Sequence, residues 1–241
     1  MAGKPEFDSD PAPYTVRRHP FGVDDRAGRL RFWAGAPATT GLVAAAVLAW
    51  LVGAALLRLG VVDVAMAGGF IPARISGNVA LFGAVPSILT PLTATFIHAD
   101  WLHLALNMLM LVWAGKQVEP ALGTRYFLLL YALGAYAAAA FQWMMGPHAT
   151  ATMIGASGAI SAVVAVYALV FSEQKVRAIG PVPAYIVRVA WLAAAWVGIQ
   201  ALIGVGFGVG GTMVAVGAHI GGFLAGLVLA RPLLRLRFAG R

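Results

Sequence analysis

Residues 41–57 read GLVAAAVLAWLVGAALL and contain no charged side chain. The hydrocarbon core of a bilayer is about 30 Å thick, so a helix needs roughly 20 apolar residues to cross it. With its flanking residues, the segment 38–58 reaches that length. It therefore predicts a membrane-spanning helix, and this prediction decides the class of fold.

The whole chain has the same character. Its 241 residues are 61% hydrophobic and only 11% charged, whereas soluble domains carry about 25% charged residues. It contains no cysteine, which excludes disulfides, thiolate catalysis and cysteine metal sites. Because residues 1–33 are polar and charged, we expect no cleavable signal peptide.

Apolar segments recur along the chain and predict an all-α, polytopic membrane protein with six transmembrane helices. They cover approximately residues 38–58, 102–118, 124–145, 152–172, 184–206 and 211–230. The connection 61–101 is long and apolar, with glycine and proline punctuation, so we expect it to form short helices lying in the outer leaflet. A glycine-rich connection at 204–212 precedes the last segment and is expected to be mobile.

The basic residues are distributed unevenly about these segments. With the amino terminus in the cytosol, 15 of the 17 lysines and arginines fall on cytosolic pieces, and Arg58 and Arg74 are the exceptions. The positive-inside rule then places both termini in the cytosol. It also explains the net charge of +8 without nucleic-acid binding. We expect a disordered basic tail over 1–37, a membrane domain over 38–231 and a basic tail over 232–241.

Polar side chains within the segments are few, and each is a candidate functional residue. His103 and Asn107 lie four residues apart on one face of the second segment, Ser157 lies in the fourth, and His219 lies in the sixth. Counting from the cytosolic charges places them roughly 18 to 24 Å above the cytosolic edge. Three helices thus bring polar groups to a common level.

Small residues surround these polar groups. Gly155 and Gly158 flank Ser157, while Gly222 and Gly226 follow His219. Small residues let helix backbones approach closely in lipid. A hydrogen bond between Ser157 and His219 requires such an approach.

A serine hydroxyl becomes a strong nucleophile when a base removes its proton, and a neutral His219 is the candidate base. The oxyanion formed on a carbonyl needs donors, for which the candidates are the Ser157 backbone N–H, Asn107 and His103. Since the spans carry no Asp or Glu at that level, the pair would be a dyad. The alternative interpretations are a packing surface at GASG and an interhelical polar clamp of His103 with Asn107.

These residues resemble the rhomboid intramembrane serine proteases. The resemblance lies in HADWLHLALN (His98, His103, Asn107), GASG at 155–158, AHIGGFLAG at 218–226 and VEPALG with Glu119, and it spans about 40–230. It implies a six-helix bundle that cleaves transmembrane segments of other proteins through an acyl-enzyme. Ser157 would be the nucleophile, His219 the base, and His103, Asn107 and the Ser157 N–H the oxyanion hole.

The sequence departs from the family pattern in two places. Leu89 and Thr90 stand where many members carry Trp-Arg in the first loop, and Ser161 stands where many carry an aromatic residue one turn after the nucleophile. We expect the Ser161 hydroxyl to bind a carbonyl one turn earlier. Asp100 is expected to cap the second helix, and His98 to tie the first loop to the bundle.

No cofactor and no metal are expected, because the chain has no His-Glu-x-x-His motif and no acidic ligand at the level of the histidines. The expected partners are the lipid bilayer and transmembrane protein substrates, in a bacterial inner membrane. The main alternative is a catalytically silent rhomboid-like protein that binds client helices. A small transporter is disfavoured, because paired broken helices are missing.

Overall fold

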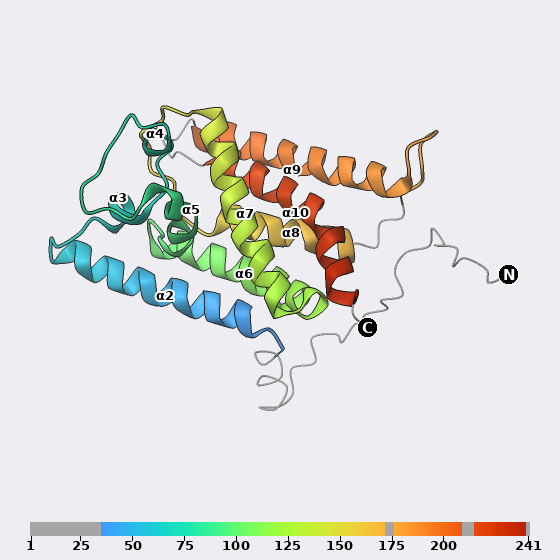
Figure 1. The fold of residues 1–241 in the computed structure, drawn as a ribbon, viewed down its shortest axis with the longest axis horizontal. Helices are drawn as coiled ribbons and strands as arrows, with labels where there is room; N and C mark the ends of the chain where they lie inside the picture. Colours follow the sequence, from blue (N-terminus) through green and yellow to red (C-terminus); the bar gives the residue numbers. More distant parts are fainter. Residues whose placement is uncertain (1–34, 172–175, 209–214, 240–241) are drawn as a thin grey trace.

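The computed structural model describes residues 35–171, 176–208 and 215–239, which form helices joined by turns with no strand among them. The long helices are α2 (Pro37–Arg58), α6 (Trp101–Leu122), α7 (Thr124–Met145), α8 (Ser157–Phe171), α9 (Ala184–Gly208) and α10 (Val216–Phe238). Figure 1 shows them packed side by side, with α2 and α9 on opposite flanks. The all-α prediction is confirmed for these residues.

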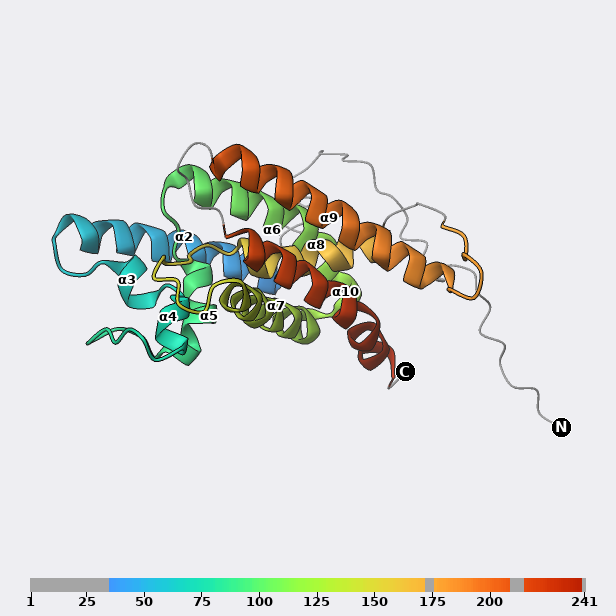
Figure 2. The same cartoon turned by 90° about the horizontal axis from the view of Figure 1, so that it is seen from above.

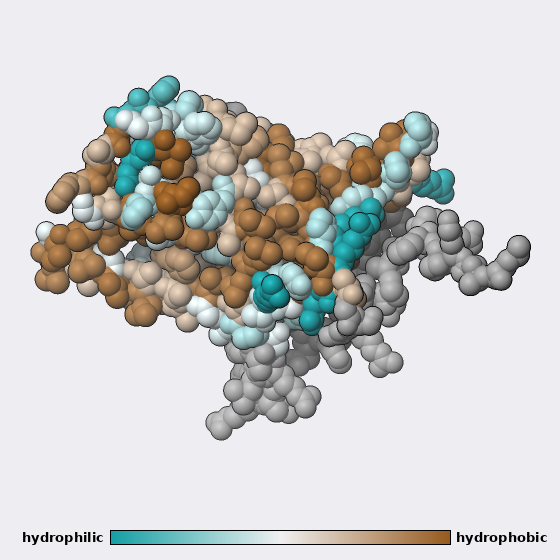
Figure 3. Space-filling model, in the orientation of Figure 1, coloured by the Kyte–Doolittle hydropathy of each residue, from teal (hydrophilic) through white to brown (hydrophobic). Residues whose placement is uncertain are grey.

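Helix α8 lies at the centre of the bundle. Its residues 158–166 are all buried, because its sequence SGAISAVVAVYALVF has no polar face, and a helix that is apolar all round is buried inside a bundle. The outer helices instead expose apolar side chains, such as Leu51 on α2 and Leu202 on α9. Hydrophobic residues cover most of the face drawn in Figure 3, as expected for a surface in contact with lipid.

Three helices, α2, α7 and α10, are long and apolar enough to cross a membrane. Residues Ser87–Phe96 together with α6 form a further candidate, bent by 89° at the break between them. Helix α8 and the stretch Ala184–Ile199 of α9 are shorter apolar helices. Three to four of the six expected spans therefore meet this criterion, which supports an integral membrane protein.

The first loop folds into short helices, as the sequence predicts. These are α3 (Val64–Gly68), α4 (Pro72–Ile75) and α5 (Thr90–Thr93), with 3-10 turns at Ser87–Leu89 and Ala94–Phe96. They gather at one end of the long helices, seen most clearly from above in Figure 2. Their position in the outer leaflet stays a prediction.

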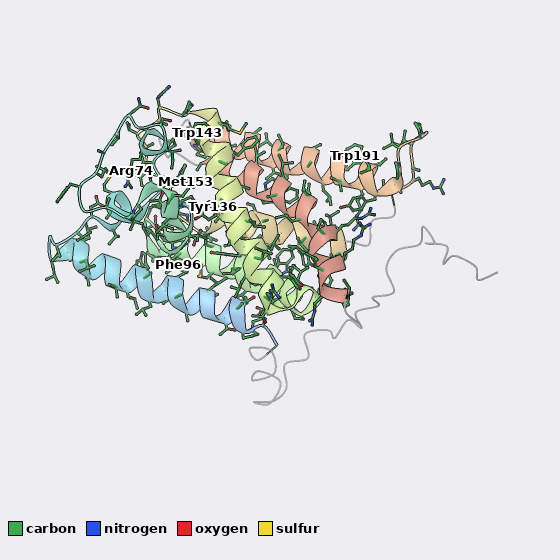
Figure 4. All side chains as sticks on the ribbon, in the orientation of Figure 1. Arg74, Phe96, Tyr136, Trp143, Met153 and Trp191 are labelled. Carbon is green, nitrogen blue, oxygen red and sulfur yellow. The ribbon has the colours of Figure 1, made fainter. Side chains whose placement is uncertain are left out.

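The connection between α7 and α8 holds the first loop in place. Phe70 and Met153 exchange two backbone hydrogen bonds of 2.9 and 2.8 Å, and Ser76 joins the indole N–H of Trp143 to the carbonyl of Pro147. Figure 4 shows Trp143 and Met153 at the same end of the bundle as Arg74, whose guanidinium donates to the carbonyl of Val85. These contacts anchor the first loop to the connection between α7 and α8.

Several helix boundaries differ from the prediction for physical reasons. Helix α8 begins at Ser157 and not at 152, because the backbone of Met153 pairs with Phe70. Helix α10 continues to Phe238, where Arg235 and Arg237 stabilise its carboxyl end. Helix α9 runs through Gly208 and so includes the first half of the glycine-rich connection. The rest of that connection, at 209–212, and residues 1–34 of the basic tail lie outside the described residues.

Glu119 fastens α2 to the bundle. Its buried carboxylate accepts hydrogen bonds from the backbone N–H groups of Ala38 (2.9 Å) and Thr39 (2.7 Å) and from the hydroxyls of Thr39 and Thr124. The first N–H groups of a helix have no partner within the helix, and they carry partial positive charge. A single carboxylate therefore caps α2 and joins it to the start of α7.

Candidate functional site

Ser157 is the first residue of α8 and follows a sharp turn. Gly155 has φ +111°, a conformation that favours glycine, and its N–H donates to the carbonyl of Ala94 in the first loop. A side chain there would also collide with the ring of His103, whose Nε2 lies 2.7 Å from the position of such a Cβ. Because Ser157 opens the helix, its N–H has no carbonyl acceptor within α8.

His219 lies in the first turn of α10, opposite Ser157. Its Nε2 is 2.7 Å from the Oγ of Ser157, which is hydrogen-bonding distance. The two residues are 62 positions apart in the chain, so tertiary packing alone brings them together. A hydroxyl bound to an imidazole is the pair that general-base activation of serine requires.

Glycine makes this approach of α8 and α10 possible. A Cβ on Gly222 would overlap the carbonyl oxygen of Gly158, and one on Gly226 would overlap that of Ala162. A Cβ on Gly158 would likewise lie 2.6 Å from the Cβ of Ala138 on α7. The small residues around the serine and the histidine thus lie where helix backbones touch.

His103 and Asn107, which lie on one face of α6, have different contacts in the structure. The ring of His103 lies against Gly155, two residues before the serine. Asn107 is buried, and its Nδ2 donates to the carbonyl of His103 at 2.9 Å. The Asn107 amide is thus bound to its own helix in this structure.

Asp100 and His98 support the same helix end. The carboxylate of Asp100 accepts from the N–H of His103 at 2.8 Å, which confirms the expected cap of α6. His98 is buried at 6% exposure and packs edge-on against His103, with ring centroids 5.1 Å apart. Within the described part of the chain, the His98 nitrogens have no hydrogen-bond partner, so His98 contacts the site by packing.

Two residues next to His219 were missed by sequence reasoning. The indole N–H of Trp196 on α9 donates to the carbonyl of His219 at 3.2 Å, and Oε1 of Gln142 on α7 accepts from the N–H of Ala218 at 3.2 Å. A glutamine within an apolar segment was a signal that could have identified Gln142. The contact of Trp196 leaves no such signal, because its acceptor is backbone.

The prediction for Ser161 is confirmed: its hydroxyl donates to the carbonyl of Ser157 at 2.8 Å. In the loops, Nδ1 of His148 lies 2.9 Å from Oδ1 of Asn78, away from Ser157 and His219. Among the residues that the structure describes, no three His, Asp or Glu side chains are grouped to hold a metal ion. The chemistry that the site offers is that of a serine hydroxyl and an imidazole.

Comparison with known proteins agrees with the motifs. A family model described as "Rhomboid domain" matches residues 86–236, a range that includes Ser157 and His219. The chain is also 30% identical over 184 residues to "Rhomboid-like protein 11, chloroplastic" of Arabidopsis thaliana. That match covers 75% of this chain and 62% of the relative, so the chain spans less than two thirds of the relative's length.

Proposed function

The chain belongs to the rhomboid family, and from that membership we propose that it is an intramembrane serine endopeptidase that cleaves transmembrane segments of other proteins. Members of this family are generally serine proteases of this kind. The observation that carries the proposal is the 2.7 Å separation between Oγ of Ser157 and Nε2 of His219. A silent member that only binds client helices would not need this pair.

In the proposed mechanism, Nε2 of His219 takes the hydroxyl proton as Oγ of Ser157 attacks the scissile carbonyl. The protonated imidazole then gives the proton to the leaving amine, which leaves an acyl-enzyme on Ser157. A water molecule, activated by the same imidazole, hydrolyses the ester and restores the hydroxyl. The protein groups that exchange protons or form bonds in these steps are the Ser157 hydroxyl and the His219 imidazole.

The oxyanion formed in these steps is proposed to bind to the Ser157 N–H, His103 and Asn107. The position of Ser157 at the start of α8 supports the role of its N–H, and the contact of the His103 ring with Gly155 supports the role of His103. For Asn107, the amide must turn from the carbonyl of His103 toward the oxyanion. Catalytic hydrogen bonds often form fully only with substrate bound.

The topology that we propose has six spans, with both termini in the cytosol and the site open to the outside, in a bacterial inner membrane. The distribution of basic residues supports this orientation. Because the chain has no cysteine, cysteines introduced one at a time can report the orientation. Asn78→Cys should react with a membrane-impermeant maleimide from outside, while Arg177→Cys should react only after permeabilisation. The reverse labelling would overturn the orientation.

The activity is tested with purified protein in liposomes and a single-span substrate protein. The wild type should cleave it, while Ser157→Ala and His219→Ala should lose cleavage. A fluorophosphonate probe should label Ser157 in the wild type. Cleavage that persists in Ser157→Ala would overturn the mechanism, and binding without cleavage by the wild type would identify a silent member.

The oxyanion role of Asn107 has its own test. Asn107→Ala should lower kcat on the order of 100-fold with little change in KM, because the interaction is made in the transition state. Unchanged kcat would remove Asn107 from the mechanism.

A further inference from the structure

Helix α9 contacts His219 through the side chain of Trp196. Trp196 is half-buried, and its indole N–H donates to the carbonyl oxygen of His219 at 3.2 Å. That carbonyl is also the intrahelical acceptor for the residue four positions later. Since a carbonyl oxygen has two lone pairs, it can accept the helical bond and the indole together.

The same indole makes a second contact with α10. It stacks on Phe223, with ring centroids 4.7 Å apart and planes inclined by 8°. Phe223 lies about one helical turn after His219, on the same side of α10. Trp196 therefore holds α10 at two points, the backbone of His219 and the ring one turn below it.

On α8, the residue one turn after Ser157 is Ser161, where many family members carry an aromatic residue. The Ser161 hydroxyl is engaged with the carbonyl of Ser157 at 2.8 Å. Ser161 therefore supplies no aromatic ring to support the orientation of His219. The indole of Trp196 contacts the backbone of that same histidine.

We propose that Trp196 is a positioning residue for His219, acting through the hydrogen bond from its indole to the His219 carbonyl and its stack on Phe223. The proposal rests on the proposed function, because it assigns His219 the role of base. It makes the alignment of the base depend on where α9 lies. General-base catalysis is sensitive to small displacements of the base, so even a slight rotation of α10 lowers turnover.

Tryptophan also anchors helices at membrane interfaces, and this alternative has a matched control on the same helix. Trp191 is 66% exposed on α9 (Figure 4) and lies five residues before Trp196, on another face of the helix. A general anchoring role predicts equal effects at the two positions. A positioning role predicts an effect on catalysis at Trp196 alone.

The experiment compares Trp196→Phe, Trp196→Ala and Trp191→Phe in liposomes by kcat, KM, the fluorophosphonate labelling rate of Ser157 and the melting temperature. Trp196→Phe keeps an aromatic ring but loses the donor, so kcat and the labelling rate should each fall about fivefold, with KM and melting temperature unchanged. Trp196→Ala should lose more, and Trp191→Phe should match the wild type.

Two results would overturn the proposal. One is a Trp196→Phe variant whose kcat and labelling rate equal those of Trp191→Phe. The other is a loss of kcat in Trp196→Phe that comes with a raised KM and a lowered melting temperature, which marks a structural role. In both, the wild type still cleaves, so these failures are distinct from failure of the proposed function, in which the wild type does not cleave.

Discussion

The contact between α8 and α10 is made by backbones, whereas α2 and α9 are attached to the bundle by individual side chains. At the centre, glycines on α10 meet carbonyl oxygens of α8 directly. At the flanks, Glu119 holds α2, and the cationic residues Arg188 and Arg231 hold the amino-terminal end of α9. Backbone contact leaves no room for adjustment, while side chains can move, so the two regions should respond differently to substitution.

The largest effect is expected from Gly222→Ala at the centre. The added Cβ would overlap the carbonyl oxygen of Gly158 and lie 2.9 Å from its carbonyl carbon. The helices must separate, which pulls His219 away from Ser157, so we expect cleavage to fall by about 100-fold or more. Substrate cleavage by the purified variant checks this. Cleavage at the wild-type rate would mean that the glycine contact does not set the distance between the two residues.

Glu119→Gln should give the next largest effect, on stability. The amide retains one acceptor oxygen and loses the negative charge at the start of α2, so several charge-assisted hydrogen bonds weaken at once. We expect a loss of about 2–4 kcal/mol in the free energy of unfolding. Thermal unfolding in detergent measures it, with Gln117→Ala on the exposed face of α6 as the control. Equal melting temperatures for the two variants would contradict the role of Glu119 as an anchor.

Arg231→Gln should have a smaller effect, because it removes one contact at the flank. The guanidinium of Arg231 lies 3.1 Å from the centre of the Tyr185 ring, which joins α10 to the amino-terminal end of α9. Cation–π pairs contribute about 0.5–1 kcal/mol at exposed sites. We therefore expect a loss of stability of that size with kcat unchanged, measured against Arg177→Gln at an exposed position in the connection before α9. A loss of kcat specific to Arg231→Gln would show that this end of α9 also controls the site.

The same contrast explains how far the sequence predicts this molecule. Features that depend on neighbours in the chain were predictable: the apolar runs that become helices, the cap by Asp100 and the bond of Ser161 to the carbonyl of Ser157. The start of α8 was not, because it depends on pairing of Met153 with the first loop. The contact of Trp196 was not predictable either, because any residue type at 219 supplies the same carbonyl.

The candidate site was predictable to a different degree. Polar side chains are rare in apolar segments, so each one is a candidate functional residue, and small residues indicate where helices can approach closely. Ser157 and His219 were selected in this way, and Oγ of Ser157 lies 2.7 Å from Nε2 of His219. The sequence pattern does not predict which acceptor each donor binds. The Asn107 amide donates to the carbonyl of His103, and this local hydrogen bond competes with the oxyanion role expected for the amide.

The smallest effect is expected from Gly198→Ala on α9, which makes the same chemical change as Gly222→Ala. Among the described residues, and apart from the adjoining residues of α9 itself, no atom lies within 4 Å of the position where a Cβ would stand on Gly198. Alanine favours a helix over glycine by up to about 1 kcal/mol, so stability should be unchanged or slightly raised, and cleavage should equal that of the wild type. Thermal unfolding and cleavage rates measure both. Because both variants add one methyl group to a helical glycine, the difference between them isolates the effect of backbone contact. If Gly198→Ala lowers cleavage as much as Gly222→Ala does, then the position of α9 is as tightly constrained as the contact between α8 and α10, and the distinction between centre and flank fails.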